Sequence, residues 1–427
     1  MAWLAAGGPV TFRRFAPSLC VAVAYGCYAL LRHVDMAVYL ALLRAVDGLP
    51  AVQPFGDANA VLLAERCWRL GVNVFVPNAC MDTGEFNYSP FLLHLMAFPL
   101  GGPERWIAGL SEAALVVLAI ALLPAATSRM ELIARCFAAV SSPVVAALGT
   151  GNIDTLIFAV SAVGLAAVPV RRGVVRFGSY GLFTLLAAIK FYPVILLCLM
   201  LRENRRILAA YAVVGLGVCI AFLAVEHAGV MAALSIIPSG PPFAGTFGAI
   251  NIPEGILVLA RIPDGPAIWI TWLLTAVALV VAWHRAPAAA AFPEETCLTF
   301  LIGGTAILVL CYFSTHNFFY RAMFFLFILP GVFAMGRTRL AAAILLLMWE
   351  PLLRFLGNGI LLPVAGGNIL LWLGYELLWW VVMVELAAML IGFARGEVAR
   401  LLGWGPARRI DDATVFTLPS ASHDLAE

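Results

Sequence analysis

Apolar stretches recur along the whole chain, separated by short polar or arginine-bearing segments. Many of them approach the roughly 17–25 residues that a helix needs to cross a bilayer. They lack the two-residue alternation of a membrane β-barrel. Because a backbone in lipid must satisfy its own hydrogen bonds, helices are the remaining way to build the spans. The pattern therefore predicts an all-α polytopic membrane protein.

The apolar stretches predict about twelve transmembrane helices. The first is expected to begin near Phe15, and the others cover 107–124, 136–148, 153–168, 178–189, 193–201, 207–225, 268–283, 297–313, 322–335, 340–356 and 369–393. The apolar segment 89–100 is expected to lie at the membrane interface without crossing. Several spans are short, which is tolerated where they line a water-filled cavity or a thinned bilayer.

Arginine clusters set the expected orientation, because basic residues in short loops stay in the cytoplasm. They occur at 13–14, 129–135, 171–176, 202–206, 285, 337–339 and 395–409. Placing all of them inside puts both termini in the cytoplasm and leaves two large outer loops, at about 35–105 and 226–265. Residues 1–403 then form a single membrane domain whose first helix is an uncleaved anchor. The polar tail 404–427 is expected to be cytoplasmic and disordered. We expect a multi-pass protein of a bacterial plasma membrane.

Composition agrees with this picture. Of the 427 residues, 63% are hydrophobic and only 12% are charged, whereas soluble domains carry about 25% charged residues. The formal net charge of +2 provides no footprint for nucleic acid.

With this topology, the outer loops collect most of the residues capable of chemistry. These are Asp57, Asp82, Glu85, Phe86–Pro90, Gly149–Asp154, Lys190–Pro193, Glu226, His227, Asn251 and Ser314–Arg321. An ionisable group at bilayer depth costs about 2.5–3.5 kcal/mol. We therefore expect a polar cavity that opens outward.

Lys190 is the only lysine of the chain and lies at the expected outer tip of a helical hairpin. Together with Arg321 at a helix entrance, it would suit an anion such as a phosphate. A carboxylate on the opposite wall would accept a proton from an alcohol. In a lipid environment, these elements favour glycosyl transfer from a polyprenyl-phosphate sugar.

Five motifs in order, from about Asp57 to Arg321, resemble the polyprenyl-phosphate-mannose-dependent α-mannosyltransferase family of the GT-C superfamily. They are Asp57 to Gly71, Phe-Asn-Tyr-Ser-Pro at 86–90, Gly-Asn-Ile-Asp at 151–154, Lys-Phe-Tyr-Pro at 190–193 and His-Asn-Phe-Phe-Tyr-Arg at 316–321. The resemblance implies a GT-C-like fold with interface helices in the first outer loop. It also implies an outward active site and an inverting transfer of a hexose, mannose, to a lipid or glycan acceptor.

The family's base is an aspartate of the first outer loop, which maps here to Asp57. Asp35 offers a similar acid–tyrosine–glycine pattern with Tyr39 and Gly48, although it has the alternative of pairing with Arg32 within the first helix. The expected donor-phosphate ligands are Lys190, Arg321 and His316. The expected sugar or acceptor contacts are Tyr88, Asn152, Asp154, Asn317 and Tyr320.

Simpler interpretations stand beside these assignments. Asn152 or Asp154 can cap a helix, Lys190 can extend its amine to the interface, and Arg321 can anchor a helix there. Glu226 and His227 are too few to make a metal site. No cofactor is assigned, and the sequence leaves a divalent metal open without supporting it.

Seven of the nine cysteines lie in apolar runs and fit a packing role, whereas Cys67 and Cys80 lie in a polar segment. These two can pair if that segment faces an oxidising compartment.

Two other function classes remain open. A transporter or flippase of a lipid-linked sugar usually shows repeated halves and broken helices near the midplane, and no repeat is evident here. A non-catalytic subunit of an envelope-assembly complex has no need for an acid, a lysine and an arginine in one cavity.

Overall fold

The computed structural model describes residues 9–47, 54–81, 84–95, 104–237, 243, 245–263, 265–314, 316–360 and 369–404. The expectations for Asp82, for Gly48 and for the tail beyond Trp404 lie outside these residues.

The described residues form seventeen α-helices, three 3₁₀-helices and two short strands. In the first half these are α1 (Pro9–Val34), α2 (Met36–Asp47), α3 (Gly56–Arg69), α4 (Pro90–Leu95), α5 (Glu104–Ala121), α6 (Arg129–Ala139), α7 (Ser142–Thr150), α8 (Ile153–Ala167), α9 (Gly173–Ile189), η1 (Tyr192–Arg202) and α10 (Arg205–Ser235). They continue with β1 (Thr246–Phe247), α11 (Asn251–Ala260), α12 (Ala267–Arg285), η2 (Ala289–Ala291), α13 (Glu295–Ser314), β2 (Asn317–Phe318), η3 (Phe319–Phe324), α14 (Phe325–Ala334), α15 (Thr338–Met348), α16 (Glu350–Ile360) and α17 (Ile369–Leu402).

The helical architecture and its apolar surface agree with a multi-pass membrane protein. Among the described residues, six helical segments are long and apolar enough to cross a membrane: Phe12–Val34, Arg129–Thr150, Arg205–Ser235, Ala267–Arg285, Glu295–Ser314 and Ile369–Leu402. Seven shorter apolar helices accompany them. The count of about twelve spans stays a prediction.

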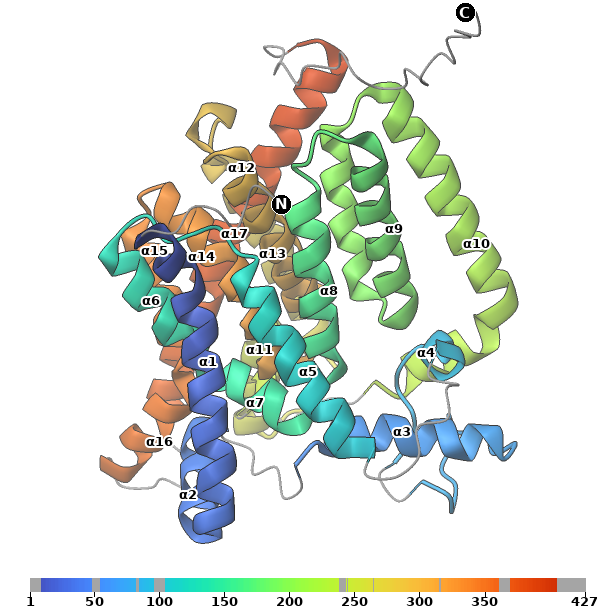
Figure 1. Cartoon of the computed structure of the whole chain (residues 1–427), viewed down its shortest axis with the longest axis vertical. Helices are drawn as coiled ribbons and strands as arrows, with labels where there is room; N and C mark the ends of the chain where they lie inside the picture. The colour runs from blue at the N-terminus through green and yellow to red at the C-terminus, as the bar shows by residue number, and fades with distance from the viewer. Residues whose placement is uncertain are drawn as a thin grey trace, which may run out of the picture.

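The two ends of the bundle differ in chemistry. At the upper end in Figure 1, the start of α9, the start of α10 and the end of α17 meet. Arg176 pairs with Glu203 at 3.0 Å, and Arg400 donates to the carbonyl oxygens of Leu201 and Glu203. The lower end holds α2, α3 and α4 and the starts of α5 and α8. Since the 17 residues of α9 rise by about 25 Å, the arginines near its start lie far from the residues at its other end.

The segment after α9 returns toward the upper end in an unusual form. We expected a short α-helical span at 193–201, but η1 is a 3₁₀-helix of 11 residues. A 3₁₀-helix rises about 2 Å per residue, so η1 extends over about 22 Å, compared with about 16 Å for an α-helix of equal length. The tighter winding therefore lets a short segment run back beside α9.

Helix α13 lies at the centre of the bundle. Fifteen of its 20 residues are buried, as expected of a helix that is apolar on all sides. Its two adjacent glycines allow close packing, because a Cβ on Gly303 would overlap Leu165 of α8 and one on Gly304 would overlap Ile328 of α14. α13 thus fixes the position of the segment that follows it, which carries His316 and Arg321.

The segment 226–265, expected as an outer loop, contains helical residues at 226–235 and 251–260. α10 continues to Ser235, because no proline interrupts it, so Glu226 and His227 lie inside this helix. Glu226 pairs with His94 of α4 at 3.3 Å. The expected interface segment 89–100 contains the short helix α4, which lies beside the end of α10 (Figure 1).

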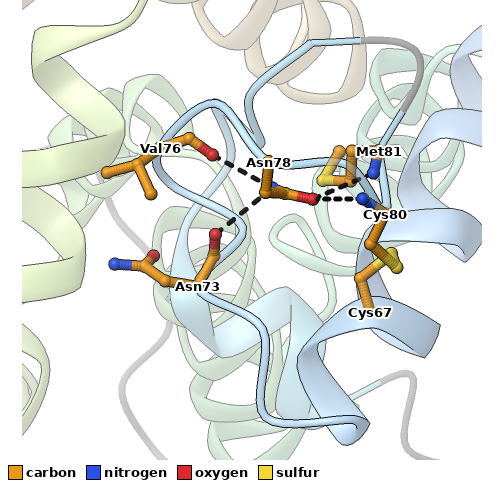
Figure 2. Close-up of a disulfide and its surroundings, with 6 residues drawn as sticks. All are labelled: Cys67, Asn73, Val76, Asn78, Cys80 and Met81. Atoms are coloured by element: carbon orange, nitrogen blue, oxygen red, sulfur yellow. Dashed lines mark hydrogen bonds between the residues drawn. A yellow bond between two sulfur atoms is a disulfide. The ribbon is translucent and has the colours of Figure 1, made fainter.

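Cys67 at the end of α3 and Cys80 form a disulfide (Figure 2). Asn78 organises the same loop, because its side chain donates to the carbonyl oxygens of Asn73 and Val76 and accepts from the amides of Cys80 and Met81. The loop after α3 is therefore attached to that helix both covalently and by hydrogen bonds.

Candidate active site

The connection between α7 and α8 is a tight turn built by Gly151 and Asn152. Gly151 ends α7 in the left-handed conformation, with φ of +62°. Asn152 is the N-cap of α8, and its Oδ1 accepts from the amide of Asp154 at 2.9 Å. The predicted capping role is therefore real, and it leaves the other end of the Asn152 amide available for a second contact.

That second contact is Asp57, in the first turn of α3. Asn152 Nδ2 donates to Asp57 Oδ2 at 2.6 Å, and the Thr150 hydroxyl contacts the same carboxylate. Burial raises the pKa of Asp57, although the hydrogen bonds from Asn152 and Thr150 and the charge of Lys190 partly oppose this. The result is a carboxylate that is more basic than an exposed aspartate.

A strained residue sets the start of α3. Phe55 adopts a left-handed conformation with φ of +55°, which is costly for a bulky side chain. Its amide donates to the Gly149 carbonyl at 2.8 Å, and its ring packs edge-on against Trp106 and directly over Gly109. These contacts hold α3 against the α7–α8 turn and thereby place Asp57 beside Asn152.

Asp154 is the centre of an ionic cluster. Its side chain is fully buried, and Lys190 Nζ donates to its Oδ1 at 2.7 Å. The Tyr192 hydroxyl donates to Oδ1 at 2.9 Å, and Arg321 Nε donates to Oδ2 at 3.2 Å. Lys190 therefore points inward and does not extend to the interface, and Arg321 is likewise no surface anchor. Asp154 holds the two cations through these contacts, and its expected contact with the sugar stays a prediction.

The two cations line a cavity of about 280 Å³. Its polar residues are Asn87, Tyr88, Ser89, Lys190, Tyr192, Ser314, His316, Asn317, Tyr320 and Arg321. Its apolar residues include Leu234, Ile237, Leu310 and Phe318. The single negative charge of Asp154 balances only one of the two cations that contact it. Such a cavity can receive an anion next to an apolar group.

Besides Arg321, the segment after α13 contributes three of the predicted residues. His316 Nε2 lies 2.8 Å from Glu254 Oε1 of α11, an acid that the sequence interpretation did not include. Asn317 is 7% exposed and donates to the carbonyl of Cys311, and as part of β2 it pairs with Phe247 of β1. Tyr320 interacts with Asn152 and lines the cavity. The segment is thereby fixed on both sides.

Glu112 of α5 is a second carboxylate near Asp57 that the sequence interpretation missed. Its Oε2 accepts from the Thr155 hydroxyl at 2.9 Å, and it interacts electrostatically with Asp57. The available signal was an acid within an otherwise apolar span.

Asp35, the alternative base, occupies a different position. Its Oδ1 accepts from the amides of Ala37 and Val38, both at 3.0 Å, so it caps the start of α2. Arg32, its expected ion-pair partner, lies over the ring of Trp106 at 5.1 Å. Asp35 is exposed and is absent from the cluster around Asn152.

Groups of three or more His, Cys, Asp or Glu side chains suited to a metal ion are not found among the described residues. Within the cluster, Asp57 is available as a base, and Lys190 and Arg321 are available as anion ligands.

A model of the family described as Glycosyltransferase family 87 matches residues 86–312, more than half of the chain. The match ends before Arg321 and begins after Asp57. No curated protein and no solved structure matches the chain.

Proposed function

Because this chain belongs to glycosyltransferase family 87, and is therefore a membrane glycosyltransferase, we propose that it transfers mannose from a polyprenyl-phosphate sugar to an acceptor hydroxyl. The observation that carries the proposal is the buried Asp154, which orients Lys190 and Arg321 in the wall of one cavity. Asp57 interacts electrostatically with Lys190 at its edge.

The reaction is a single displacement at the anomeric carbon. The acceptor oxygen forms a bond to this carbon while the bond from the carbon to the phosphate oxygen breaks. The acceptor proton passes to the Asp57 carboxylate, and the electron pair of the broken bond leaves with the polyprenyl phosphate. The configuration at the anomeric carbon is inverted. Burial makes Asp57 a stronger base than an exposed aspartate, which suits general-base catalysis near neutral pH.

Lys190 and Arg321 bind the donor phosphate and stabilise the charge that grows on it as the sugar departs. Asp154 is a positioning residue in this proposal, because its carboxylate contacts both cations and is fully buried. His316, held by Glu254, lines the same cavity and completes the polar wall around the phosphate.

Tyr88, Asn152 and Tyr320 are the proposed contacts of the transferred sugar. Tyr88 and Tyr320 line the cavity, and the ammonium of Lys190 lies 5.0 Å from the Tyr88 ring centroid. Asn152 contacts Asp57 and interacts with Tyr320 of the cavity wall, so we place the sugar ring next to these side chains during the transfer.

We further propose a GT-C-like arrangement in which α3 and α4 are interface helices and the site faces the outer side of the membrane. The arginine clusters support this orientation, because basic loops stay in the cytoplasm and the α9 end that carries Lys190 is opposite to them. A lipid-linked donor would then approach the cavity through the bilayer.

The test uses the purified full chain in lipid nanodiscs with polyprenyl-phosphate mannose and candidate acceptors. The expected result is release of polyprenyl phosphate that depends on Lys190 and is lost in Lys190→Gln. Release that is absent with every acceptor and with water would refute the proposal and favour transport or a scaffolding role. Arg395→Gln, outside the cavity on α17, is the matched control and should retain activity.

A further inference from the structure

A second cavity of about 420 Å³ lies between α1, α2 and the start of α5. It shares no lining residue with the cavity that contains Lys190. Its wall carries the side chains of three tyrosines, a phenylalanine and a tryptophan, and the guanidinium of Arg32; the five residues are Tyr25, Tyr28, Tyr39, Phe55 and Trp106. None of the residues assigned to the donor phosphate or to the transferred sugar lines this cavity.

The second cavity adjoins the candidate base. Phe55 and Gly149 are part of its lining; they are hydrogen-bonded to each other and lie close in sequence to Asp57 and Thr150. A chain of electrostatic interactions also runs from Tyr25 to Glu112 and from Glu112 to Asp57. Asp57 in turn interacts with Lys190 of the first cavity. Asp57 lines neither cavity, but it interacts with Lys190 of the first cavity and is two residues from Phe55 of the second.

The lining indicates the chemical class of the ligand. Tyrosine and tryptophan present a broad apolar face with a polar end, which fits a sugar ring that has apolar C–H faces and hydroxyl edges. Arg32 is half-buried and lies 5.1 Å from the centroid of the Trp106 ring, so its position is fixed by packing. Arginine is the side chain best suited to bind a phosphate through two parallel hydrogen bonds.

We propose that this cavity binds the acceptor, and that the acceptor is a sugar bearing an anionic phosphate ester. The inference rests on the proposed transferase function. The sugar ring packs on Trp106 and the tyrosines, Arg32 binds the phosphate ester, and one sugar hydroxyl reaches Asp57. The donor phosphate lies in the other cavity, so the acceptor oxygen approaches from the side away from the leaving group, as an inverting displacement requires.

Two sources supply this chemistry: the headgroup of an anionic glycolipid or a soluble sugar phosphate. A smaller apolar pocket of about 40 Å³ shares Tyr25, Tyr28, Tyr39 and Gly149 with the second cavity and adds Leu43 and Leu148. It offers space for part of an attached hydrocarbon chain.

The experiment measures product formation at saturating polyprenyl-phosphate mannose with three acceptor probes: octyl α-mannoside, its 6-phosphate ester, and free mannose 6-phosphate. Donor hydrolysis by water is measured separately without acceptor. Trp106→Ala should raise the acceptor KM about tenfold or more for all probes, as expected when a buried aromatic contact is lost. Arg32→Gln should raise it only for the two phosphorylated probes. In Arg32→Gln, the donor KM and hydrolysis by water should not change. The ring of Trp106 also packs against Phe55 at the start of α3, so for Trp106→Ala only the acceptor KM is interpreted.

A matched control pair is present elsewhere in the protein. Arg395 lies 4.7 Å from the ring centroid of Trp283, the same type of contact as Arg32 with Trp106. Trp283→Ala and Arg395→Gln should leave the acceptor KM of all probes unchanged. If Trp106→Ala does not fold, Arg32→Gln decides the question.

The outcomes separate the two proposals. Absence of any donor cleavage by the wild-type protein would refute the transferase function itself. Intact donor cleavage with unchanged acceptor KM in both cavity variants would overturn the acceptor site alone, as would a wild-type protein that hydrolyses the donor but uses none of the three probes. A lower KM for the octyl phosphate ester than for free mannose 6-phosphate supports the site and a glycolipid acceptor, whereas equal values support the site and a soluble one.

Discussion

Replacing Asp57 by asparagine removes the proposed base while keeping its shape. The new side chain retains an oxygen that can accept the hydrogen bond from Asn152, now 2.6 Å from Asp57 Oδ2, so the contact between α3 and the α7–α8 turn should persist. A general base contributes about 10²–10⁴ to the rate. We therefore expect the kcat of Asp57→Asn to fall by this factor, equivalent to about 2.7–5.5 kcal/mol of transition-state free energy.

The donor KM should stay the same or decrease in this variant. Asp57 interacts with Lys190, and removing its negative charge makes the phosphate-binding wall more positive. The assay is steady-state release of polyprenyl phosphate from polyprenyl-phosphate mannose at varied donor concentrations. A loss that appears in donor KM with kcat retained would refute the role of Asp57 as a base.

Stability provides an independent check on the same variant. A raised folded-state pKa means that the charged form of Asp57 destabilises the protein, so its stabilising contribution is present at low pH and lost as pH rises through that pKa. Asp57→Asn stays neutral at every pH, so at pH 7 its melting temperature should equal or exceed that of the wild type. Asp35→Asn is the matched control, because asparagine also caps helices well. Full activity of Asp57→Asn together with an inactive Asp35→Asn would reverse the assignment.

Three further predictions concern the surroundings of the base. Asn152→Ala removes a hydrogen bond that lowers the pKa of Asp57, so the acid limb of the pH–kcat profile should shift to higher pH; an unshifted limb would contradict the assignment. Gly151→Ala places a Cβ 3.0 Å from Ala58 Cβ at a φ of +62°. Because this displaces α3, the rate of transfer should fall about tenfold or more. Gly178→Ala, which has open space around it, is the control and should leave the rate unchanged. Cys67→Ser with Cys80→Ser removes a cross-link worth about 3 kcal/mol for a loop of this length, and amide hydrogen exchange in 71–81 should accelerate; unchanged protection would show that the hydrogen bonds of the loop suffice.

The sequence predicted the start of α8 and the location of Lys190 and Arg321 better than it predicted the contacts among the buried residues. The glycine and asparagine before α8 predicted a capped helix start, and the arginine clusters predicted that Lys190 and Arg321 lie at the opposite end of the bundle, because both are local or directional signals. Local signals of this kind could not decide whether Asp35 or Asp57 is the base. The choice depends on α1 ending at Val34 and on α3 docking against the α7–α8 turn, which is a contact between distant segments.

The burial of Asp154 was also beyond the sequence. A carboxylate at a helix start is usually exposed, and only the approach of Lys190, Tyr192 and Arg321 from three other elements turns it into the centre of a cluster. Glu112 was missed because the span that contains it was identified by its apolar residues, and its single acid was given no role. The second cavity left no local pattern, because α1, α2, α5 and α7 form it together.

The charged residues of the ionic cluster are synthesised at different times. Asp154 and Lys190 are 36 residues apart, at the start of α8 and the end of α9, so they can enter the bilayer together as one hairpin. Entering as a neutral pair avoids a cost of about 2.5–3.5 kcal/mol for each lone charge. Arg321 is 167 residues from Asp154 and is synthesised long afterwards. The Asp154–Lys190 pair is therefore neutral while the hairpin is being inserted, and the second positive charge on Asp154 is added only when Arg321 docks.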